Sequence, residues 1–353
     1  MLWSVFNNQK NDSNMDDNEL KEIIKILASG NSLTEIESYK AFKTIMSGDA
    51  SPSQIGAFLV ALKIKGETVE EIFGGAKVLR ENMISIQAPK NAIDTVGTGG
   101  DGIGTYNIST ASAFVLAGAD IPVAKHGNRA ISSNSGASDV LSELNVNINA
   151  DIKILEKSLK LSKITFLNAP NHHPAMRNVG PIRVELGIRT IFNILGPLAN
   201  PAYVKRQLTG VYSKKLVEPI AKVLLKLGFE HAWVVHGSDG LDEMTTTGHT
   251  FVAEIKYGKM KTFNIAPEEL GFPIANIQEL KGGNSKKNAS ELVKILNGEN
   301  NAYRNIVLLN SAAGILISGK TNNLKDGILM AKESIDSGKA YKALKNLIKI
   351  TNE

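Results

Sequence analysis

The first ninety residues space their apolar side chains as short amphipathic helices do. Two segments repeat apolar positions at steps of three or four residues: Ile36, Tyr39, Phe42 and Ile45 in the first, and Ile55, Phe58, Leu59 and Leu62 in the second. Spacing of this kind indicates one buried face on each helix. We therefore expect a small helical domain over residues 16–88. A polar extension without the features of a signal peptide is expected before it, over residues 1–15.

Local signals divide this region into separate helices. Three segments match the capping box, in which a hydroxyl residue is followed three positions later by Glu or Gln: Ser32–Glu35, Ser51–Gln54 and Thr68–Glu71. A glycine lies shortly upstream of each box, at Gly30, Gly48 and Gly66, where it can end the preceding helix. The boxes therefore predict three helix starts.

From about Ala92 the pattern changes to short apolar strands between Gly-rich turns and amphipathic helices. The strand candidates are residues 93–96, 123–125, 164–167, 207–212 and 231–236, and the helix candidates are 111–118, 139–144, 152–161 and 216–227. This alternation predicts an α/β domain over residues 89–353 with a mostly parallel central sheet. Helices from about residues 174–200 are expected to join the small domain. Ligands of such sheets bind at the carboxyl ends of the strands, where the Gly-rich segments fall.

Composition limits the possible classes of protein. The 353 residues are enough for about two domains, and the absence of cysteine removes disulfides, zinc–thiolate sites and cysteine nucleophiles. The net charge of +5 raises a nucleic-acid hypothesis, but acidic and basic residues alternate along most helices. No unbroken apolar stretch of about 18 residues occurs. We therefore expect a cytoplasmic protein with neither a nucleic-acid nor a membrane partner.

A glycine-rich segment follows the first predicted strand and reads Gly97-Thr98-Gly99-Gly100-Asp101. Three glycines in four positions leave backbone N–H groups open to a bulky anion, although a plain tight turn would use the same residues. The next segment, residues 105–110, opens a helix with several hydroxyl and amide side chains. Helix capping explains one of these polar residues, so the two segments together predict a phosphate site.

A basic segment, Lys125-His126-Gly127-Asn128-Arg129, ends the second predicted strand. Side chains of this kind in one place favour contact with an anion. For His126 alone, a hydrogen-bonded structural role is the better hypothesis. Small hydrogen-bond donors follow in residues 132–136.

Two histidines and three arginines follow the third predicted strand. His172 and His173 are adjacent, so their side chains diverge, and no carboxylate shares their helical face within one turn. Metal ligation by this pair is therefore not expected. Arg177, Arg183 and Arg189 are six residues apart and cannot share one face. At least one is structural, and one is enough to clamp a carboxylate.

An acidic turn containing Asp242 and Glu243 follows the strand at residues 231–236. Neighbouring carboxylates repel each other unless a hard cation lies with them. An acidic turn alone is usually solvated surface. Opposite two anion-binding segments, the pair predicts a Mg²⁺ site that shares the ion with substrate phosphates.

Taken in order, these segments resemble those of the anthranilate phosphoribosyltransferases. The matching motifs are G-T-G-G-D at 97–101, N-I-S-T at 107–110, K-H-G-N-R at 125–129, H-H-P-A-M at 172–176 and the acidic turn ending at Glu243. Residues 187–201 resemble the interdomain segment of the family. The resemblance implies a nucleoside phosphorylase/phosphoribosyltransferase-like fold, a homodimer, and transfer of phosphoribosyl from 5-phosphoribosyl 1-pyrophosphate to the amine of anthranilate in tryptophan biosynthesis.

The resemblance also implies the site residues. Phosphoribosyl pyrophosphate is expected to contact Gly97, Thr98, Gly99, Gly100, Asp101, Thr105, Asn107, Ile108, Ser109, Thr110, Lys125, His126, Gly127, Asn128, Arg129, Ala130, Ile131, Ser132 and Ser133. Anthranilate is expected to contact Gly97, His126, Asn128, Arg183, Gly196 and Pro197. Ser109, Asp242 and Glu243 would bind Mg²⁺, and Lys125, Asp242 and Glu243 would act in catalysis.

The loop after the basic segment departs from the family pattern. The family commonly reads Lys-Ser-Gly-Ser-Ala-Asp where this chain reads Asn134-Ser-Gly-Ala-Ser-Asp139. A lysine is missing and a Ser–Ala pair is exchanged, which puts a hydroxyl contact with pyrophosphate at position 137 in doubt. The polar N-terminal extension has no recognised counterpart in the family.

The expected reaction displaces pyrophosphate from C1 of the sugar. The aromatic amine of anthranilate is neutral near pH 7, so catalysis needs positioning and leaving-group stabilisation rather than a strong base. A pyrimidine nucleoside phosphorylase is the alternative, since it resembles this fold and also has a Gly-rich phosphate loop. Asp101 and the Asp242–Glu243 pair argue against it, because phosphorolysis needs no clamp for magnesium pyrophosphate. The acidic turn together with the anion-binding loops argues against a second alternative, a noncatalytic nucleic-acid binder on the same fold.

Overall fold

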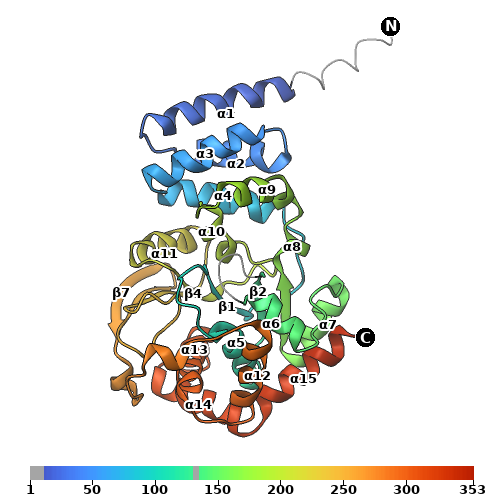
Figure 1. Cartoon of the computed structure of the whole chain (residues 1–353), viewed down its shortest axis with the longest axis vertical. Coiled ribbons are helices and arrows are strands. Elements are labelled where there is room, and N and C mark those ends of the chain that lie inside the picture. Colours follow the sequence, from blue (N-terminus) through green and yellow to red (C-terminus); the bar gives the residue numbers. More distant parts are fainter. Residues whose placement is uncertain (1–11, 130–134) are drawn as a thin grey trace. The chain divides into compact units, whose positions relative to one another are not determined.

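The computed structural model describes residues 12–129 and 135–353, with the backbone alone for residues 12–18. The chain divides into two compact units, drawn in Figure 1. One comprises the chain up to Ile84 together with His173–Ala199, and the other comprises Ser85–His172 and Asn200–Glu353. Among the helices of the described ranges, none has both the length and the hydrophobicity that crossing a bilayer requires.

The first unit is helical. Its elements are α1 (Asp12–Ala28), α2 (Glu35–Ser47), α3 (Pro52–Lys65), α4 (Val69–Glu81), η1 (Pro174–Asn178), α9 (Gly180–Leu186), α10 (Phe192–Leu195) and η2 (Gly196–Leu198). The rings of Phe58 and Phe192 meet that of Phe42 edge to face, with centroids 5.4 and 5.6 Å away. Helix α4 approaches α2 closely because Gly75 carries no side chain: a Cβ there would lie 2.9 Å from the Phe42 ring. The expected extension is only partly described, since α1 begins at Asp12 and residues 1–11 lie outside the described ranges.

Two of the three predicted capping boxes are confirmed. The side chains of Ser51 and Thr68 accept from the backbone N–H three residues later, at Gln54 and Glu71. The first box was assigned wrongly, because it is formed by Thr34 and Glu37 rather than by Ser32 and Glu35. Thr34 has the extended backbone of an N-cap (φ −69°, ψ 164°), so the helix starts two residues later than Ser32 would require.

One of the two predicted apolar faces is confirmed in full. Ile55, Phe58, Leu59 and Leu62 are all buried. In the other helix Phe42 and Ile45 are buried, but Ile36 is 68% exposed, so its place on that face was predicted wrongly. Steps of three residues fall short of a turn by about 60° each, so three steps carry the chain to the opposite side of the helix.

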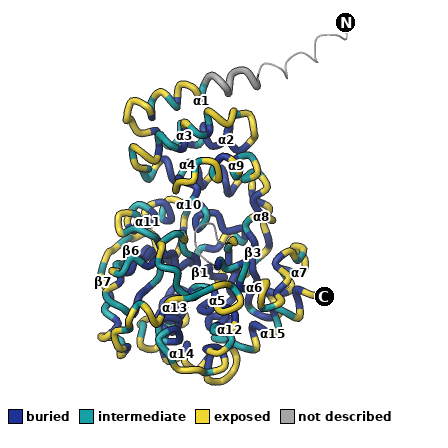
Figure 2. Tube along the Cα trace, viewed as in Figure 1, coloured by how far each residue is buried: buried dark blue, intermediate teal, exposed yellow. Residues whose placement is uncertain are grey.

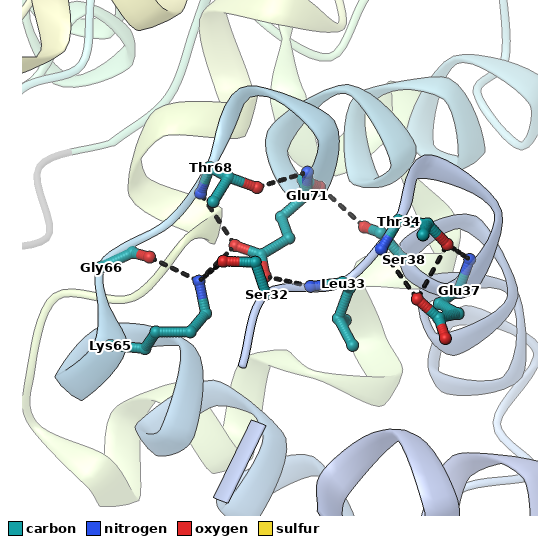
Figure 3. A network of polar contacts seen from close by, with 9 residues as sticks. All are labelled: Ser32, Leu33, Thr34, Glu37, Ser38, Lys65, Gly66, Thr68 and Glu71. Carbon is teal, nitrogen blue, oxygen red and sulfur yellow. Dashed lines mark hydrogen bonds and ion pairs between the residues drawn. The ribbon is translucent and has the colours of Figure 1, made fainter. Parts of the chain in front are cut away.

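A buried carboxylate joins the starts of α2 and α4 to the end of α3 (Figure 3). Glu71 is fully buried; its Oε1 accepts the Leu33 N–H at 2.9 Å, and its Oε2 accepts Lys65 Nζ at 2.9 Å and the Thr68 N–H at 2.8 Å. The Ser38 hydroxyl donates to the Glu71 carbonyl oxygen at 2.8 Å. The charge of Glu71 is therefore compensated by one ammonium and two backbone donors, as a buried ion requires.

The second unit contains a seven-stranded sheet in the order β3-β2-β1-β4-β5-β6-β7. The strands are β1 (Ile93–Gly97), β2 (Val123–Gly127), β3 (Ile164–Asn168), β4 (Arg206–Gly210), β5 (His231–Gly237), β6 (Thr250–Lys256) and β7 (Lys259–Ile265). Strands β1 to β5 are parallel, and β6 and β7 add antiparallel pairs at one edge. The mostly parallel α/β fold and its five predicted strands are confirmed.

The last two strands were not predicted. They form a hairpin in which Lys256 pairs with Lys259 across Tyr257 and Gly258. Both loop residues have positive φ, 46° and 79°, as a type I′ turn demands. Strand β7 is mostly exposed and carries lysines, so it lacks the apolar run that marked the other strands.

Helices cover the sheet and the loops between strands. They are α5 (Ile108–Gly118), α6 (Ala137–Glu143), α7 (Ile152–Ser162), α8 (Ala169–His172), α11 (Val217–Lys226), α12 (Ser285–Leu296), α13 (Ala302–Ser318), α14 (Leu324–Asp336) and α15 (Lys339–Thr351), with η3 (Lys214–Leu216), η4 (Pro267–Leu270) and η5 (Ile277–Leu280). Helices α5 and α13 pack on β1 and on each other, and both are buried along most of their length (Figure 2).

The strand order reverses between β1 and β4. The chain places β2 and β3 on one side of β1, then returns to lay β4 and β5 on the other side. In open α/β sheets the crevice beyond the carboxyl ends of such a pair is where ligands bind. The loops after Gly97 of β1 and Gly210 of β4 are therefore the expected location of the ligand-binding site.

The Glu71 network predicts a large difference between two glutamates of the helical unit. Glu71→Ala should lower the free energy of unfolding of the chain by about 3–5 kcal/mol, because Lys65 would be left buried without its partner. Glu19→Ala removes the partner of Lys40 in a half-exposed ion pair and should cost at most about 1 kcal/mol. Urea unfolding followed by circular dichroism measures both. Equal losses would contradict the role given to burial.

Candidate functional site

The glycine-rich loop after β1 is shaped by left-handed backbone. Gly99 and Gly100 have φ of 67° and 74°, conformations that other residues adopt only with strain. The Thr98 N–H donates to the Gly210 carbonyl of β4 at 3.0 Å, which ties the loop to the strand beside it. The Gly99 N–H donates to Asp242 Oδ2 at 2.6 Å. The predicted phosphate loop is thus held against the predicted acidic turn.

The acidic turn lies directly on the ends of β1 and β4. A Cβ on Gly210 would be 1.5 Å from the Asp242 carbonyl oxygen, and a Cβ on Gly97 would be 2.4 Å from Asp242 Oδ2. At Gly210 the clash is with backbone and excludes a side chain, and at Gly97 a side chain would have to displace the Asp242 carboxylate. The two strand ends therefore carry glycine so that Asp242 can lie across the point where the strand order reverses.

The second carboxylate of the turn reaches the start of α5. Glu243 Oε1 accepts the Ser109 N–H at 3.1 Å, and the Ser109 hydroxyl accepts Lys125 Nζ at 3.2 Å. Lys125 also donates to the Thr95 carbonyl oxygen at 2.7 Å and is buried. Segments predicted separately from the sequence, at Ser109, Lys125 and Glu243, are thus brought together.

Burial and like charge set the protonation of this cluster. The pKa of Asp242 is raised to about 7 by burial and by the neighbouring charge of Asp101, and that of Glu243 to about 8 by burial and by Asp242. Burial lowers the pKa of Lys125, against the opposing effect of nearby carboxylates that include Asp94. The carboxylates therefore lie where a positive charge would be most stabilised.

Two carboxylates and a hydroxyl are oxygen ligands suited to a hard divalent cation. No group of three or more His, Cys, Asp or Glu side chains able to hold a metal occurs within residues 12–129 and 135–353. Mg²⁺ commonly binds through one or two carboxylates and completes its coordination with water and substrate phosphate. Ser109, Asp242 and Glu243 fit that mode of binding.

The backbone of the acidic turn is also held by Asn310, a residue that was not predicted from the sequence. Asn310 of α13 is buried; its Oδ1 accepts the Met244 N–H at 3.0 Å and its Nδ2 donates to the Met244 carbonyl at 2.8 Å. Met244 directly follows Glu243, so the amide fixes the main chain next to the acidic pair. The sequence does hold a signal for this residue, because Asn310 is the single asparagine in the apolar run of residues 306–318.

A second missed residue supports the basic segment. Asp94 is buried in β1, where its Oδ1 accepts the His126 N–H at 3.2 Å and its Oδ2 accepts Asn200 Nδ2 at 2.7 Å. Asn200 Nδ2 also donates to the Ala124 carbonyl at 2.8 Å. Burial raises the pKa of Asp94 to about 6, and the charge of Lys125 opposes that rise. The sequence does hold a signal for this residue, because a carboxylate is unusual inside a buried strand such as Ile93–Gly97.

The basic segment itself divides between core and surface. Lys125 and His126 are buried within β2, whereas Asn128 and Arg129 are exposed after it. The Asn128 carbonyl accepts the Ser138 N–H at 3.2 Å. The predicted contacts at Ala130, Ile131, Ser132 and Ser133, and Asn134 beside them, lie outside the described residues.

The exchanged Ser–Ala pair has a clear structural consequence. Ser138 is buried and its hydroxyl donates to Asn168 Oδ1 at 3.0 Å. The Ser138 hydroxyl is therefore bonded to the end of β3, and Ala137 has no hydroxyl that could contact pyrophosphate.

The segment that opens α5 is anchored on both sides. Asn107 Nδ2 donates to the Ser135 carbonyl at 3.3 Å, and its Oδ1 accepts Asn288 Nδ2 at 3.0 Å. Thr105 forms an isolated antiparallel bridge with Lys281. The side chains of Ile108 and Thr110 are 1% exposed and belong to the core of the unit.

The remaining predicted anthranilate residues belong to the helical unit. Arg183 lies on α9 with its guanidinium 5.6 Å from the centroid of the Phe192 ring, and burial lowers its pKa. Gly196 and Pro197 begin η2. His172 and His173, for which no metal was expected, are buried.

Comparison with known proteins covers both units. Residues 89–341 match the a/b domain of the glycosyl transferase family, and residues 21–83 match its helical bundle domain. Anthranilate phosphoribosyltransferase of Paramagnetospirillum magneticum is 54% identical over 333 residues, which are 94% of this chain and 96% of the relative.

Two solved structures are similar along their whole length. The crystal structure of anthranilate phosphoribosyltransferase from Thermus thermophilus has a TM-score of 0.89 and 38% identity, covering 94% of this chain and 99% of that one. The Saccharomyces cerevisiae enzyme in complex with PRPP and Mg has a TM-score of 0.87 and 31% identity, covering 95% and 98%. With its fold, its site and its relatives in agreement, the chain belongs to the anthranilate phosphoribosyltransferase family.

Proposed function

We propose that this chain transfers the phosphoribosyl group of 5-phosphoribosyl 1-pyrophosphate to the amine of anthranilate and releases pyrophosphate. The observation that carries the proposal is the acidic pair Asp242–Glu243: Asp242 is buried on the glycine ends of β1 and β4 and accepts the Gly99 N–H, and half-buried Glu243 accepts the Ser109 N–H. Adjacent carboxylates beside a loop suited to anions can share a hard cation with a bound phosphate group. Relatives of this chain are anthranilate phosphoribosyltransferases, and a metal-binding acidic pair fits the reaction that this name describes.

The donor is bound by the second unit. The backbone N–H groups of the loop at residues 97–101 and of the start of α5 would receive phosphate oxygens, since a helix N-terminus favours negative charge. Bound to Ser109, Asp242 and Glu243, Mg²⁺ would supply positive charge to the pyrophosphate. Lys125 would stabilise the same leaving group from the end of β2. These contacts gain strength as negative charge develops, which is how they accelerate the reaction.

The acceptor needs orientation more than activation. Arg183 would clamp the carboxylate of anthranilate, while Gly97, His126, Asn128, Gly196 and Pro197 would contact the remainder of the molecule. The neutral amine attacks C1 of the sugar as the C1–O bond to pyrophosphate breaks, and the attacking nitrogen then loses a proton. Holding both reactants in this geometry supplies a large part of the rate.

We also propose that the protein acts as a homodimer in the cytoplasm, as part of tryptophan biosynthesis. Support for the dimer comes from the family resemblance and from large apolar side chains exposed on the helical unit, Ile36 at 68% and Ile64 at 82%. Such side chains commonly mark interaction surfaces.

The direct test is an assay that follows the loss of anthranilate and the release of pyrophosphate in the same reaction. Anthranilate fluorescence should fall on addition of phosphoribosyl pyrophosphate, pyrophosphate should appear in equal amount, and EDTA should abolish both changes. Phosphate-dependent cleavage of a pyrimidine nucleoside without Mg²⁺ would instead support the phosphorylase alternative, which the relatives do not favour.

Removing one carboxylate of the pair tests the metal role. Asp242→Asn should lower kcat by about 10²–10³-fold, because one contact to the leaving-group charge is lost. The matched control is Asp120→Asn, which changes a carboxylate of the same unit whose side chain is 71% exposed. Rates are measured over a Mg²⁺ titration. Unchanged turnover of Asp242→Asn at limiting Mg²⁺ would contradict the assignment.

Removing the guanidinium of α9 tests the acceptor role. Arg183→Ala should raise KM for anthranilate by roughly 10–100-fold, the effect of losing a hydrogen bond to a charged group, with a smaller change in KM for phosphoribosyl pyrophosphate. Arg177→Ala, an exposed arginine of the same unit, is the control. Steady-state kinetics with each substrate varied distinguish the two variants. A preserved KM for anthranilate in Arg183→Ala would remove this residue from the site.

A further inference from the structure

The carboxylate of Asp239 accepts hydrogen bonds from residues on both sides of the acidic turn. Asp239 Oδ1 accepts the Leu241 N–H at 3.1 Å, and its Oδ2 accepts the Thr245 hydroxyl at 2.6 Å and the Thr247 hydroxyl. The Thr247 N–H in turn donates to Thr245 Oγ1 at 3.0 Å. We call Asp239, Thr245 and Thr247 the clasp. It connects residues before Asp242 with residues after Glu243 and so closes the turn that carries the acidic pair.

The clasp is packed tightly against the end of β5. A Cβ on Gly237 would lie 2.3 Å from Asp239 Oδ1 and 3.1 Å from Thr245 Cβ. Thr245 is fully buried, and its N–H donates to Thr250 Oγ1 of β6 at 3.0 Å. The strand end therefore lacks a side chain where the clasp must fit, as at Gly97 and Gly210 beneath Asp242.

The acidic turn needs such a restraint. Asp242 is buried and the adjacent Glu243 is half-buried, and Asp101 adds a third carboxylate whose charge acts on both. Like charges in a poorly solvated place push the chain apart. Asn310 fixes the main chain at Met244, and the clasp fixes it at Leu241 and Thr245.

We propose that Asp239 is a positioning residue, which acts through Thr245 and Thr247 to hold Asp242 and Glu243 in the geometry that receives Mg²⁺ with pyrophosphate. This inference rests on the proposed function. Groups behind metal ligands typically change metal affinity by 10–100-fold when they are removed. The role is geometric: Asp239 supplies hydrogen-bond acceptors, while the charges that act on Asp242 and Glu243 come from Asp101, Lys125 and, for Glu243, also from Asp242.

Two adjacent threonines provide a matched comparison. Thr245 and Thr246 are both fully buried, but Thr245 donates to Asp239, whereas the Thr246 hydroxyl has no hydrogen-bond partner among the described residues. Thr245→Val and Thr246→Val remove the same hydroxyl and keep the same shape. Calorimetry gives the Kd of phosphoribosyl pyrophosphate with excess Mg²⁺ and with EDTA. The ratio of the two constants measures how much the metal contributes.

Thr245→Val should reduce this ratio by about tenfold, and Thr246→Val should leave it near that of the unchanged protein. If neither variant changes the ratio, the proposal is wrong. It is also wrong if both variants change the ratio equally, because the effect would then come from any substitution in this part of the core and not from the contact with Asp239. If the unchanged protein itself shows no gain from Mg²⁺, the proposed metal role fails, and the clasp fails with it. Melting temperatures of both variants separate loss of folding from loss of metal binding.

Asp239 itself lies nearer the surface, which allows a second test that does not depend on a buried substitution. Asp239→Ala should reduce the ratio at least as much as Thr245→Val does. Asp239→Asn should recover most of that loss, because an amide can still accept from Leu241 and donate to the threonine hydroxyls. An Asn variant as weak as the Ala variant would assign the effect to the charge of Asp239 and overturn the clasp.

Discussion

The site depends on one steric constraint, the contact of Asp242 with the ends of two neighbouring strands. Gly97 and Gly210 close β1 and β4, and a methyl group on either would overlap atoms of Asp242. Because β1 and β4 flank the reversal of strand order, this contact puts the acidic pair at the end of the sheet where α/β folds commonly bind ligands. The same contact brings the Gly99 N–H to Asp242, so the glycine-rich loop is held against the acidic turn.

A second constraint is electrostatic and follows from the first. Packing on the sheet buries Asp242 and leaves Glu243 half-buried, and burial with neighbouring negative charge raises their pKa values to about 7 and about 8. The turn is nevertheless fixed by hydrogen bonds that hold its backbone at Leu241, Met244 and Thr245. Rigid neighbours thus prevent the relaxation by which two carboxylates would otherwise reach solvent. A site of this kind is preorganised for positive charge, the usual source of electrostatic catalysis.

The sequence was informative wherever a local rule decides the structure. Apolar runs correctly predicted β1 to β5. Gly-rich or charged segments at the strand ends predicted the residues that lie near Ser109 in the structure. One error arose where two hydroxyl residues, Ser32 and Thr34, matched the capping-box pattern equally well, and another arose at Ile36, where steps of three residues drift around the helix. The hairpin of β6 and β7 was missed because an exposed edge strand needs no apolar run. Asp94 and Asn310 were missed because their partners lie far along the chain, at Asn200 and Met244, and only the folded chain makes them neighbours.

The two halves of the proposed reaction differ in how the chain supports them. The donor half is a continuous set of contacts within one compact unit, in which glycines, hydroxyls, an ammonium and two carboxylates each have a partner that explains them. Phosphate and magnesium chemistry demands that combination, so residues and family lead to the same conclusion. The acceptor half consists of an aromatic ring and a carboxylate, which many surfaces could bind. Arg183, beside the Phe192 ring, is the residue proposed to bind the carboxylate, so the proposal for the acceptor depends mainly on this guanidinium.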